Sequence, residues 1–520
     1  MASLLGDEIV GYIQKCDSDS LIPKAESMGY ESQEILLKAL NFVVALASNF
    51  VDTEETPSGE QFMSFAYTVM ETLPENLPGI TSLLQNASNT LGIVWSERKD
   101  FDKMLHWLNI AEKLRASGRP AVDERLYTQT TYFLAQAHGK LNNRDESASW
   151  CLVTLKRQQT HAHEYSELEW SRNAMHLSEY YMTCGWITMA HHCLNHARVV
   201  LTRANGSDAE DAACMDIAFG KLFLRALEVS RLAYIGELDD LETSGAFKDI
   251  PPDMALPPIP DETNATASNA NASSSSSSSA SDIGALMAHN AQEAAAIFRR
   301  ALARFQRALE YYVLDGFVTE HVSILNDISN CYRSLIGFEA DLERKARMYK
   351  ARLNLLEPLT KELNPSVFES MLQQLLLDCG TISSDLHDTR YSQWEQDKTV
   401  ITVKKLNDIA YRGVLYFTRF INSFKNDKGE VPYPLKDADL HHPYITAHFH
   451  LARLHMRIQS SDVRLTVSLL KKSRDEYAFV VKYHQDASMG EIFGAEADLA
   501  KQIVELLALK ITKLSQTMQL

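Results

Sequence analysis

Apolar residues recur at three- and four-residue spacing along most of the chain, and this period indicates α-helices. The pattern is clearest in three segments rich in Leu, Ala, Glu, Lys and Gln, at residues 35–47, 298–313 and 499–514. Alternation of apolar and polar residues at period two, which would indicate strands, is almost absent. The 15 prolines gather between the helical segments. The sequence therefore predicts an all-α fold.

A repeat of 43 residues runs through part of the N-terminal half. A leucine followed by a small residue recurs at three places, which are Leu91-Gly92, Leu134-Ala135 and Leu177-Ser178. A ring follows each small residue three positions later, as Trp95, His138 and Tyr181. This arrangement resembles the tetratricopeptide pattern, in which small residues let two antiparallel helices approach. Because that pattern repeats every ~34 residues, longer helices or loops must fill the difference. We predict a tetratricopeptide-like solenoid of antiparallel helix pairs.

The composition changes abruptly between residues 250 and 283. Five prolines there precede a tract of Asn, Ala and Ser that includes seven consecutive serines, Ser273 to Ser279. Such a tract cannot bury enough apolar area to offset the entropy of ordering it. We therefore expect an N-terminal helical-repeat subdomain at 1–250, a disordered Pro/Ser-rich insertion at 251–283 and a C-terminal helical-repeat subdomain at 284–520.

The charge balance bears on the class of partner. The chain has 51 Lys and Arg against 68 Asp and Glu, a formal net charge of −17. A surface of that sign repels nucleic-acid phosphates and anionic lipid but attracts a basic protein surface. Asp7 and Glu8 interrupt the place where a secretory signal would need an apolar stretch, and the seven cysteines form no CxxC pair. These features predict a cytoplasmic protein with no nucleic-acid partner and no membrane insertion.

The motifs of common catalytic sites are missing from the sequence. It contains no Gly-rich phosphate loop followed by Lys-Ser/Thr, no GxSxG, no HExxH and no kinase signature set. Histidine pairs such as His191-His192 and His441-His442 have no Cys or Asp at metal-ligand spacing. We therefore predict no enzyme, no metal, no cofactor and no small-molecule substrate. An enzyme remains open only if its site is assembled from residues far apart in sequence.

A helical solenoid offers a concave groove lined by the first helix of each pair. In the tetratricopeptide frame the residue after each small position, namely Ile93, Gln136 or Glu179, points into that groove. Phe133 and His176 lie one helical turn earlier in two of the repeats. Such a mixed apolar and amide surface suits a helix of another protein. For Ile93 and Phe133, packing against the adjacent helix pair is an equally good interpretation.

Several segments along the chain together resemble those of one known protein family. They include LGIVWSERKDF (91–101), YFLAQAHGKL (132–141), TLKRQ (154–158) and LEWSRNAMHLSEYY (168–181). Further agreement comes from FVDTEETPSGEQF (50–62), DGFVTEHV (315–322), the long segment 338–365 and IGEL (235–238). The segments follow one another from about residue 40 to residue 510 in the order found in the kinesin-binding protein family, also called KIF-binding protein. The chain therefore resembles that family over most of its length.

The resemblance implies a cytoplasmic, cytoskeleton-associated adaptor that binds kinesin motor domains and blocks their attachment to microtubules. It also implies roles in microtubule organisation, axon growth, and mitochondrial and vesicle transport. Motor contacts in the family fall in stretches that match Phe133, Gln136, Leu141, Gln158 and His176 here. Phe133 replaces a tyrosine and His176 a threonine of the family pattern. The Ser-rich tract replaces a charged helical stretch of the family.

A generic tetratricopeptide-like scaffold or co-chaperone is the alternative. Proteins of that class bind acidic C-terminal peptides through a clamp of Lys, Arg and Asn in the groove. Asn86 and Arg172 are available for such a clamp, but the sequence offers no clear lysine pair in the groove. The kinesin-binding interpretation is therefore favoured, with an acidic groove expected to cover the basic, track-binding face of a motor.

Overall fold

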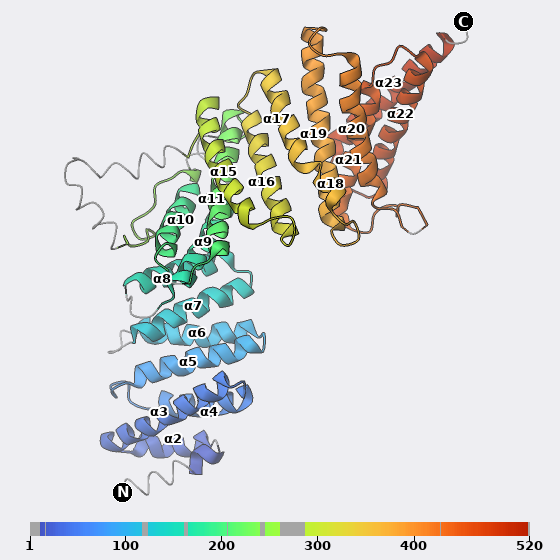
Figure 1. Ribbon diagram of the computed structural model, residues 1–520. Helices are drawn as coiled ribbons and strands as arrows, with labels where there is room; N and C mark the ends of the chain where they lie inside the picture. Colours follow the sequence, from blue (N-terminus) through green and yellow to red (C-terminus); the bar gives the residue numbers. More distant parts are fainter. Residues whose placement is uncertain are drawn as a thin grey trace, which may run out of the picture. The chain divides into compact units, whose positions relative to one another are not determined.

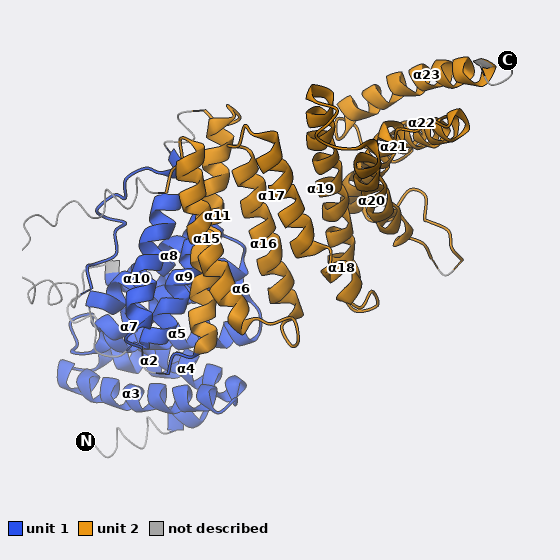
Figure 2. Ribbon diagram, turned by 45° about the horizontal axis from the view of Figure 1, so that its top comes forward, with its two compact units in different colours: residues 1–208, 245–275 blue, residues 209–244, 276–520 orange. Residues whose placement is uncertain are grey.

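The computed structural model describes residues 11–517 apart from 16, 117–122, 161–164, 205, 240–244, 260–285 and 427. Regular structure within these residues is helical, with no strand (Figure 1). The all-α prediction is therefore confirmed. The chain forms two compact units, one of residues 1–208 with 245–275 and the other of residues 209–244 with 276–520 (Figure 2).

Unit 1 is built from consecutive antiparallel helix pairs. Each of α3, α5, α7 and α9 packs against the helix that follows it, and α5 also contacts α3 and α7. The confirmed fold is thus a helical repeat made of such pairs. The helices of unit 1 are α2 (Ser18–Ser27), α3 (Tyr30–Asp52), α4 (Thr56–Glu71), α5 (Ile80–Glu97), α6 (Phe101–Ala116), α7 (Glu124–Lys140), α8 (Arg144–Thr160), α9 (Glu167–Thr183) and α10 (Ile187–Leu201).

The turns inside three of these pairs are equivalent and keep the 43-residue period. Each contains one residue in the left-handed region, which is Lys99 (φ 61°), Asn142 (φ 61°) or Gly185 (φ 76°). The next backbone N–H in each turn donates to the carbonyl of the ring position, over 3.0, 2.9 and 2.8 Å respectively. This 6→1 bond with a left-handed residue is the Schellman ending of a helix. The repeat seen in the sequence therefore also specifies where each pair turns.

The small residues of the repeat lie where paired helices come close. A Cβ added to Gly92 on α5 would stand 3.0 Å from a side-chain carbon of Leu108 on α6. On α8, the Ser147 hydroxyl donates to the Ala135 carbonyl of α7 over 2.7 Å. Leu91, Leu134 and Leu177 are all buried. The leucines thus supply the core of the stack, and the small residues allow the approach.

Helix α3 is long and apolar enough to cross a membrane by length and composition alone, with a mean hydropathy of 1.6. In the structure it packs against α4 and α5. One face of α3, which carries Leu36, Leu40, Val43 and Ala47, is buried in the core of unit 1. In this fold α3 is therefore a core helix.

Unit 2 is a second series of packed helices. Helix α11 packs against α15 and α16, and contacts then run through α17 and α19 to α23. Because its packing partners lie in this unit, α11 joins unit 2 although its sequence precedes the expected boundary at residue 250. The helices are α11 (Ala209–Tyr234), α15 (Ala291–Tyr311), α16 (Val318–Ile336), α17 (Leu342–Leu356), α18 (Leu359–Glu362), α19 (Glu369–Gln396), α20 (Val403–Asn422), a 3-10 turn (Ala438–Leu440), α21 (His441–Arg457), α22 (Val463–Asp486) and α23 (Gly494–Thr517).

Two glycines allow close helix packing in the core of unit 2, Gly380 between α19 and α20 and Gly413 between α20 and α21. A Cβ on Gly380 would stand 2.7 Å from the Phe417 ring, and one on Gly413 would stand 2.6 Å from Leu454. Phe417 is fully buried.

We expect Gly380→Ala to lower the unfolding free energy by ~1–3 kcal/mol, because the added methyl group displaces the Phe417 ring, and this cost exceeds the gain from alanine's better helix propensity. Thermal unfolding checks this. Gly494→Ala is the control, since nothing lies within 4 Å of its Cβ, and an equal effect of both substitutions would contradict the packing argument.

Residues 245–259 form a strap that packs on α10 of unit 1. Leu256 and Ile259 in the strap are buried, and the Leu256 N–H donates to Nε2 of His192 over 2.9 Å. The Lys248 ammonium lies 3.9 Å from the centroid of the Trp186 ring. The expectation of disorder is therefore wrong for residues 251–259, whose leucine and isoleucine supply the apolar area that the Ser-rich tract lacks. Residues 260–283 of the expected insertion lie outside the described residues.

The contact between His192 and Leu256 requires a neutral imidazole. Burial lowers the pKa of His192 to about 4, and the neighbouring His196, His191 and Lys156 add to the effect. The unfolded chain, with a pKa near 6.5, binds a proton as the pH falls through that value, whereas the folded chain does not until about pH 4. His192 therefore destabilises the folded state increasingly from pH 6.5 down to 4, by about 2 kcal/mol at pH 5.

We accordingly expect the melting temperature to fall between pH 7 and pH 5, and to fall less in His192→Gln. Comparing the two proteins isolates His192, because burial also lowers the pKa of His387 and of His450 to about 4 in unit 2. Equal pH dependence of the two proteins would show that His192 titrates normally in the fold.

Candidate functional site

Three adjoining hollows follow helices α7, α8 and α9 on one face of unit 1, with volumes of about 650, 510 and 430 Å³. Tyr132 lines the first and second hollows. Gly139, Ser147 and Cys151 line the second and third. These shared residues make the three hollows neighbours along α7, α8 and α9, and we call them together the α7–α9 groove.

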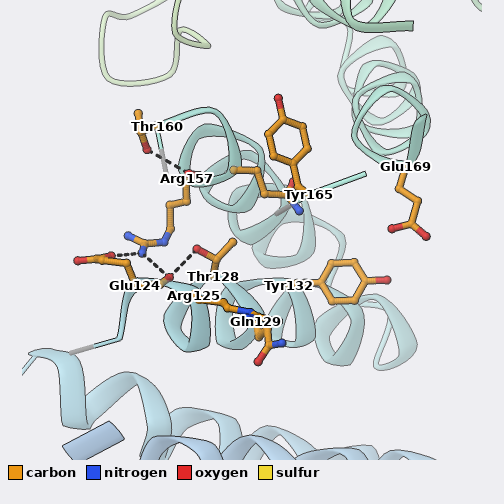
Figure 3. Close-up of a pocket in the computed structure, with 10 residues that line it drawn as sticks. Glu124, Arg125, Thr128, Gln129, Tyr132, Arg157, Thr160, Tyr165 and Glu169 are labelled. Carbon is orange, nitrogen blue, oxygen red and sulfur yellow. Dashed lines mark hydrogen bonds and ion pairs between the residues drawn. The ribbon is translucent and has the colours of Figure 1, made fainter. Parts of the chain in front are cut away.

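The first hollow is framed by an ion pair at one side and by two tyrosines at the other (Figure 3). Arg157 of α8 pairs with the Glu124 carboxylate at the start of α7, and it also donates to the Glu124 carbonyl over 3.2 Å. The Arg157 guanidinium lies 4.0 Å from the centroid of the Tyr127 ring. Cation–π attraction and the ion pair together hold this arginine in place. Tyr132 and Tyr165 complete the opposite wall.

The third hollow has a mainly apolar lining, whereas the second is about as polar as the first. Cys151 of α8 lines the second and the third hollow, and burial raises the pKa of its thiol to about 12. Cys151 therefore stays protonated and behaves as a small apolar residue rather than as a nucleophile. At the far end, the Tyr180 hydroxyl donates to Asp145 Oδ1 over 2.6 Å. His176 and Glu179 project from α9 beside this bond.

The charges that line the α7–α9 groove are balanced. Four basic side chains face three acidic ones, which are Arg125, Lys140, Arg144 and Arg157 against Glu124, Glu169 and Glu179. The expectation of an acidic groove is therefore wrong. The net charge of −17 describes the whole surface, and arginines clustered on α7 and α8 offset the local carboxylates.

Two polar groups in the groove are available for hydrogen bonding. The Oε1 atom of Gln158 is buried and has no hydrogen-bond partner among the described residues. A buried acceptor left without a donor costs about 1–3 kcal/mol. Burial raises the pKa of the Tyr132 hydroxyl, and the nearby Glu169 carboxylate raises it further, so this hydroxyl remains a donor. The groove thus presents an unsatisfied acceptor and a protonated phenol.

The structure brings three of the five predicted contact residues to the groove. Gln158 lines the first hollow, Gln136 the second and His176 the third. Phe133 instead packs beside the buried cluster that includes Met104 and Leu134. This position agrees with the alternative interpretation, in which Phe133 packs against the adjacent helix pair. Leu141 is the half-buried residue that caps the C-terminus of α7. Whether any of the five contacts a partner stays a prediction.

Sequence reasoning missed Tyr132 and Arg157, which dominate the first hollow. Tyr132 adjoins the chosen Phe133, and one residue along a helix turns a side chain by about 100°. Position 132 is four residues before Gln136, so it shares the groove face with that glutamine. This spacing could have identified the tyrosine. Arg157 carried no comparable signal, because its partner Glu124 lies 33 residues away.

Members of the histidine pairs make contacts that hold parts of the fold together. His192 accepts the strap amide, and His448 Nδ1 lies 2.6 Å from Oε2 of Glu476. His387 and His455 are buried as well, so several histidines belong to the core rather than to a helix surface or groove. Within the described ranges, no group of three or more His, Cys, Asp or Glu side chains is placed to hold a metal ion.

The fold and the groove define a helical-repeat protein with a charge-balanced groove on one unit. Comparison with known families is consistent with this class. The family model described as KIF-1 binding protein C terminal matches residues 168–514. The chain therefore belongs to the KIF-binding protein family.

Relatives with the same family name align over nearly the whole chain. The zebrafish (Danio rerio) KIF-binding protein is 28% identical over 527 residues, which are 91% of this chain and 82% of that protein. The human protein is 26% identical over 539 residues, covering 91% and 84%. The Drosophila melanogaster protein is 23% identical over 540 residues, covering 94% and 88%.

Solved structures support the fold. A structure titled "Kinesin binding protein (KBP)" superposes with a TM-score of 0.65 at 21% identity, covering 98% of this chain and 92% of that one. A second, titled "Cryo-EM map of KIFBP", gives a TM-score of 0.64 at 22% identity and covers 100% and 98%. At these identities the likeness is one of fold alone.

Proposed function

We propose that this chain is a cytoplasmic adaptor that binds kinesin motor domains in the α7–α9 groove and blocks their attachment to microtubules. The observation that carries the proposal is the position of Gln136, Gln158 and His176. The family resemblance marks these residues for motor contact, and each of them lines one of the three adjoining hollows of unit 1. Relatives named for KIF binding align over more than nine-tenths of the chain.

Recognition would rest on hydrogen bonds and shape rather than on local net charge. A helix of the motor that carries amide or ammonium donors would satisfy the free Oε1 of Gln158. Its apolar residues would pack over Cys151 and the Tyr132 ring. A motor face that holds acidic tubulin must be basic, so occupying that face in the groove excludes the track by steric overlap. Through such inhibition the chain would act in microtubule organisation, axon growth, and mitochondrial and vesicle transport.

The experiment that tests this is competitive microtubule pelleting. A kinesin motor domain is bound to microtubules with a non-hydrolysable ATP analogue, and the purified chain is added in increasing amounts. The motor should move to the supernatant together with the chain. Recovery of motor, chain and microtubules in one pellet would overturn the blocking mechanism, and no binding to free motor would overturn the adaptor function.

The overall charge of −17 predicts a salt-dependent association rate. Because the groove itself is balanced, attraction to a basic motor acts at long range and is screened as the Debye length shortens from about 10 Å at 0.1 M to about 3 Å at 1 M salt. Stopped-flow measurements should show the association rate constant falling over this range while the dissociation rate changes little. An association rate independent of salt would mean that the acidic surface does not steer the motor.

A further inference from the structure

The last helix of unit 2, α23, carries an exposed row of leucines. Leu499, Leu506 and Leu509 are 47%, 65% and 71% exposed, and their spacings of seven and three residues place them on one face of the helix. A different face, which includes Ala500, Leu507 and Ile511, is buried, and α22 is the helix against which α23 packs (Figure 2). An exposed row of large apolar side chains commonly marks a surface that another protein covers.

The charges beside the leucine row are separated along the helix. Glu496 and Asp498 lie near its N-terminus, whereas Lys510 and Lys513 lie near its C-terminus. All four are exposed, and none has an ion-pair partner in the part of the chain that the structure describes. Lys501 and Glu505 lie between them, four residues apart, and offset each other. The face is therefore acidic at one end and basic at the other.

We propose that this face binds the same face of a second copy, with the two α23 helices antiparallel about a two-fold axis. If the axis passes near residue 504, Leu499 of each copy lies opposite Leu509 of the other, and Leu506 lies opposite Gln502. The same register brings Glu496 beside Lys510 on one flank of the face and Asp498 toward Lys513 near its centre. One antiparallel arrangement thus covers the leucines and pairs all four charges, as a self-complementary interface requires.

A second copy fits this face better than a parallel arrangement or another occupant. Parallel helices would set acidic end against acidic end and basic end against basic end. A uniformly charged partner would match one end of the helix and repel the other. Three leucines per copy form a small interface, below the roughly 1,200 Å² that stable complexes bury. The dimer is therefore expected to be weak, with a Kd on the order of 10–100 µM.

Sedimentation velocity on the full chain tests the proposal over a range from tenfold below to tenfold above that Kd. The average mass should rise from 58.6 kDa toward twice that value. Leu506→Asp should weaken the dimer at least tenfold. The matched control is Leu415→Asp on α20, a leucine that is 56% exposed on a different helix, and it should leave the dimer unchanged. A monomer at every concentration, or no effect of Leu506→Asp, would overturn the proposal.

Charge reversal tests the register independently. Lys510→Glu with Lys513→Glu should weaken the dimer by placing acidic ends together, and adding Glu496→Lys with Asp498→Lys should restore it. Failure of the fourfold variant to recover the dimer would rule out the antiparallel pairing. Exposed side chains are changed throughout, so circular dichroism spectra matching the wild type confirm that each variant is folded.

Disulfide trapping tests the same geometry directly. Residues 499 and 509 are about 15 Å apart along one helix, too far for a disulfide within one copy. Leu499→Cys with Leu509→Cys should therefore form covalent dimers under oxidation, in excess of the wild-type background. Leu499→Cys alone should not, whereas a parallel dimer would link through that single position and would overturn the proposed orientation.

Discussion

Replacing both Gln136 and Gln158 with alanine should weaken the binding of a kinesin motor domain about 5- to 150-fold. The two amides line the first and second hollows of the α7–α9 groove, and removing buried hydrogen bonds to a partner costs about 1–3 kcal/mol. The loss should lie mainly in the dissociation rate, because the overall charge that steers encounter is unchanged. Biolayer interferometry with an immobilised motor domain measures both rates.

The control for this pair is Gln485→Ala, an exposed glutamine of α22 in unit 2. Its affinity for the motor should equal that of the wild type. If the double variant keeps full affinity with an unchanged melting temperature, neither glutamine belongs to the binding site. The separate single variants then show how the loss is divided, since the Gln158 acceptor is buried and unpaired before binding whereas Gln136 is exposed.

Trp170→Ala should lower the unfolding free energy by about 3–5 kcal/mol, the cost of removing a large buried ring. Trp170 of α9 is fully buried, and its Nε1–H donates to the Leu155 carbonyl of α8 over 3.0 Å. The ring therefore holds together two of the three helices that line the groove. Urea unfolding followed by far-UV circular dichroism measures the change, and motor binding should weaken in parallel.

Trp170→Phe separates the two contributions of this residue. It keeps most of the apolar volume but removes the indole donor, so the loss should be clearly smaller than in the alanine variant. Equal losses in both variants would mean that the hydrogen bond, rather than the packing, dominates. A loss below about 1 kcal/mol in Trp170→Ala would contradict the role given to the ring.

The sequence predicted the repeat because its signal is local. Leu91, Leu134 and Leu177 mark the core, and Gly92 marks the close approach of α5 and α6. The turns follow the same spacing, although Lys99 in one of them gives no sign of its left-handed conformation. Helix periodicity and small-residue spacing depend on neighbours a few positions away, so one sequence suffices to read them.

The composition of the groove could not be predicted in the same way. Its charge balance depends on contacts such as Arg157 with Glu124, which the fold brings together from different helices. Net charge said nothing about that local balance. The family pattern indicates Phe133 rather than Tyr132 because it gives residue positions but not the rotation of the helix. Three of the five predicted contact positions thus line the α7–α9 groove, whereas the charge balance of the groove differs from the acidic groove that the sequence predicts.

The strap at residues 245–259 affects how unit 1 can be made. Leu256 bonds to His192, which precedes it by 64 residues, and α11 of unit 2 is synthesised between them. A nascent chain therefore cannot finish its first unit until the ribosome has already translated a helix of the second. A fragment that ends at residue 208 would expose the apolar sites that Leu256 and Ile259 normally cover. A fragment made to express unit 1 alone should therefore end beyond residue 259.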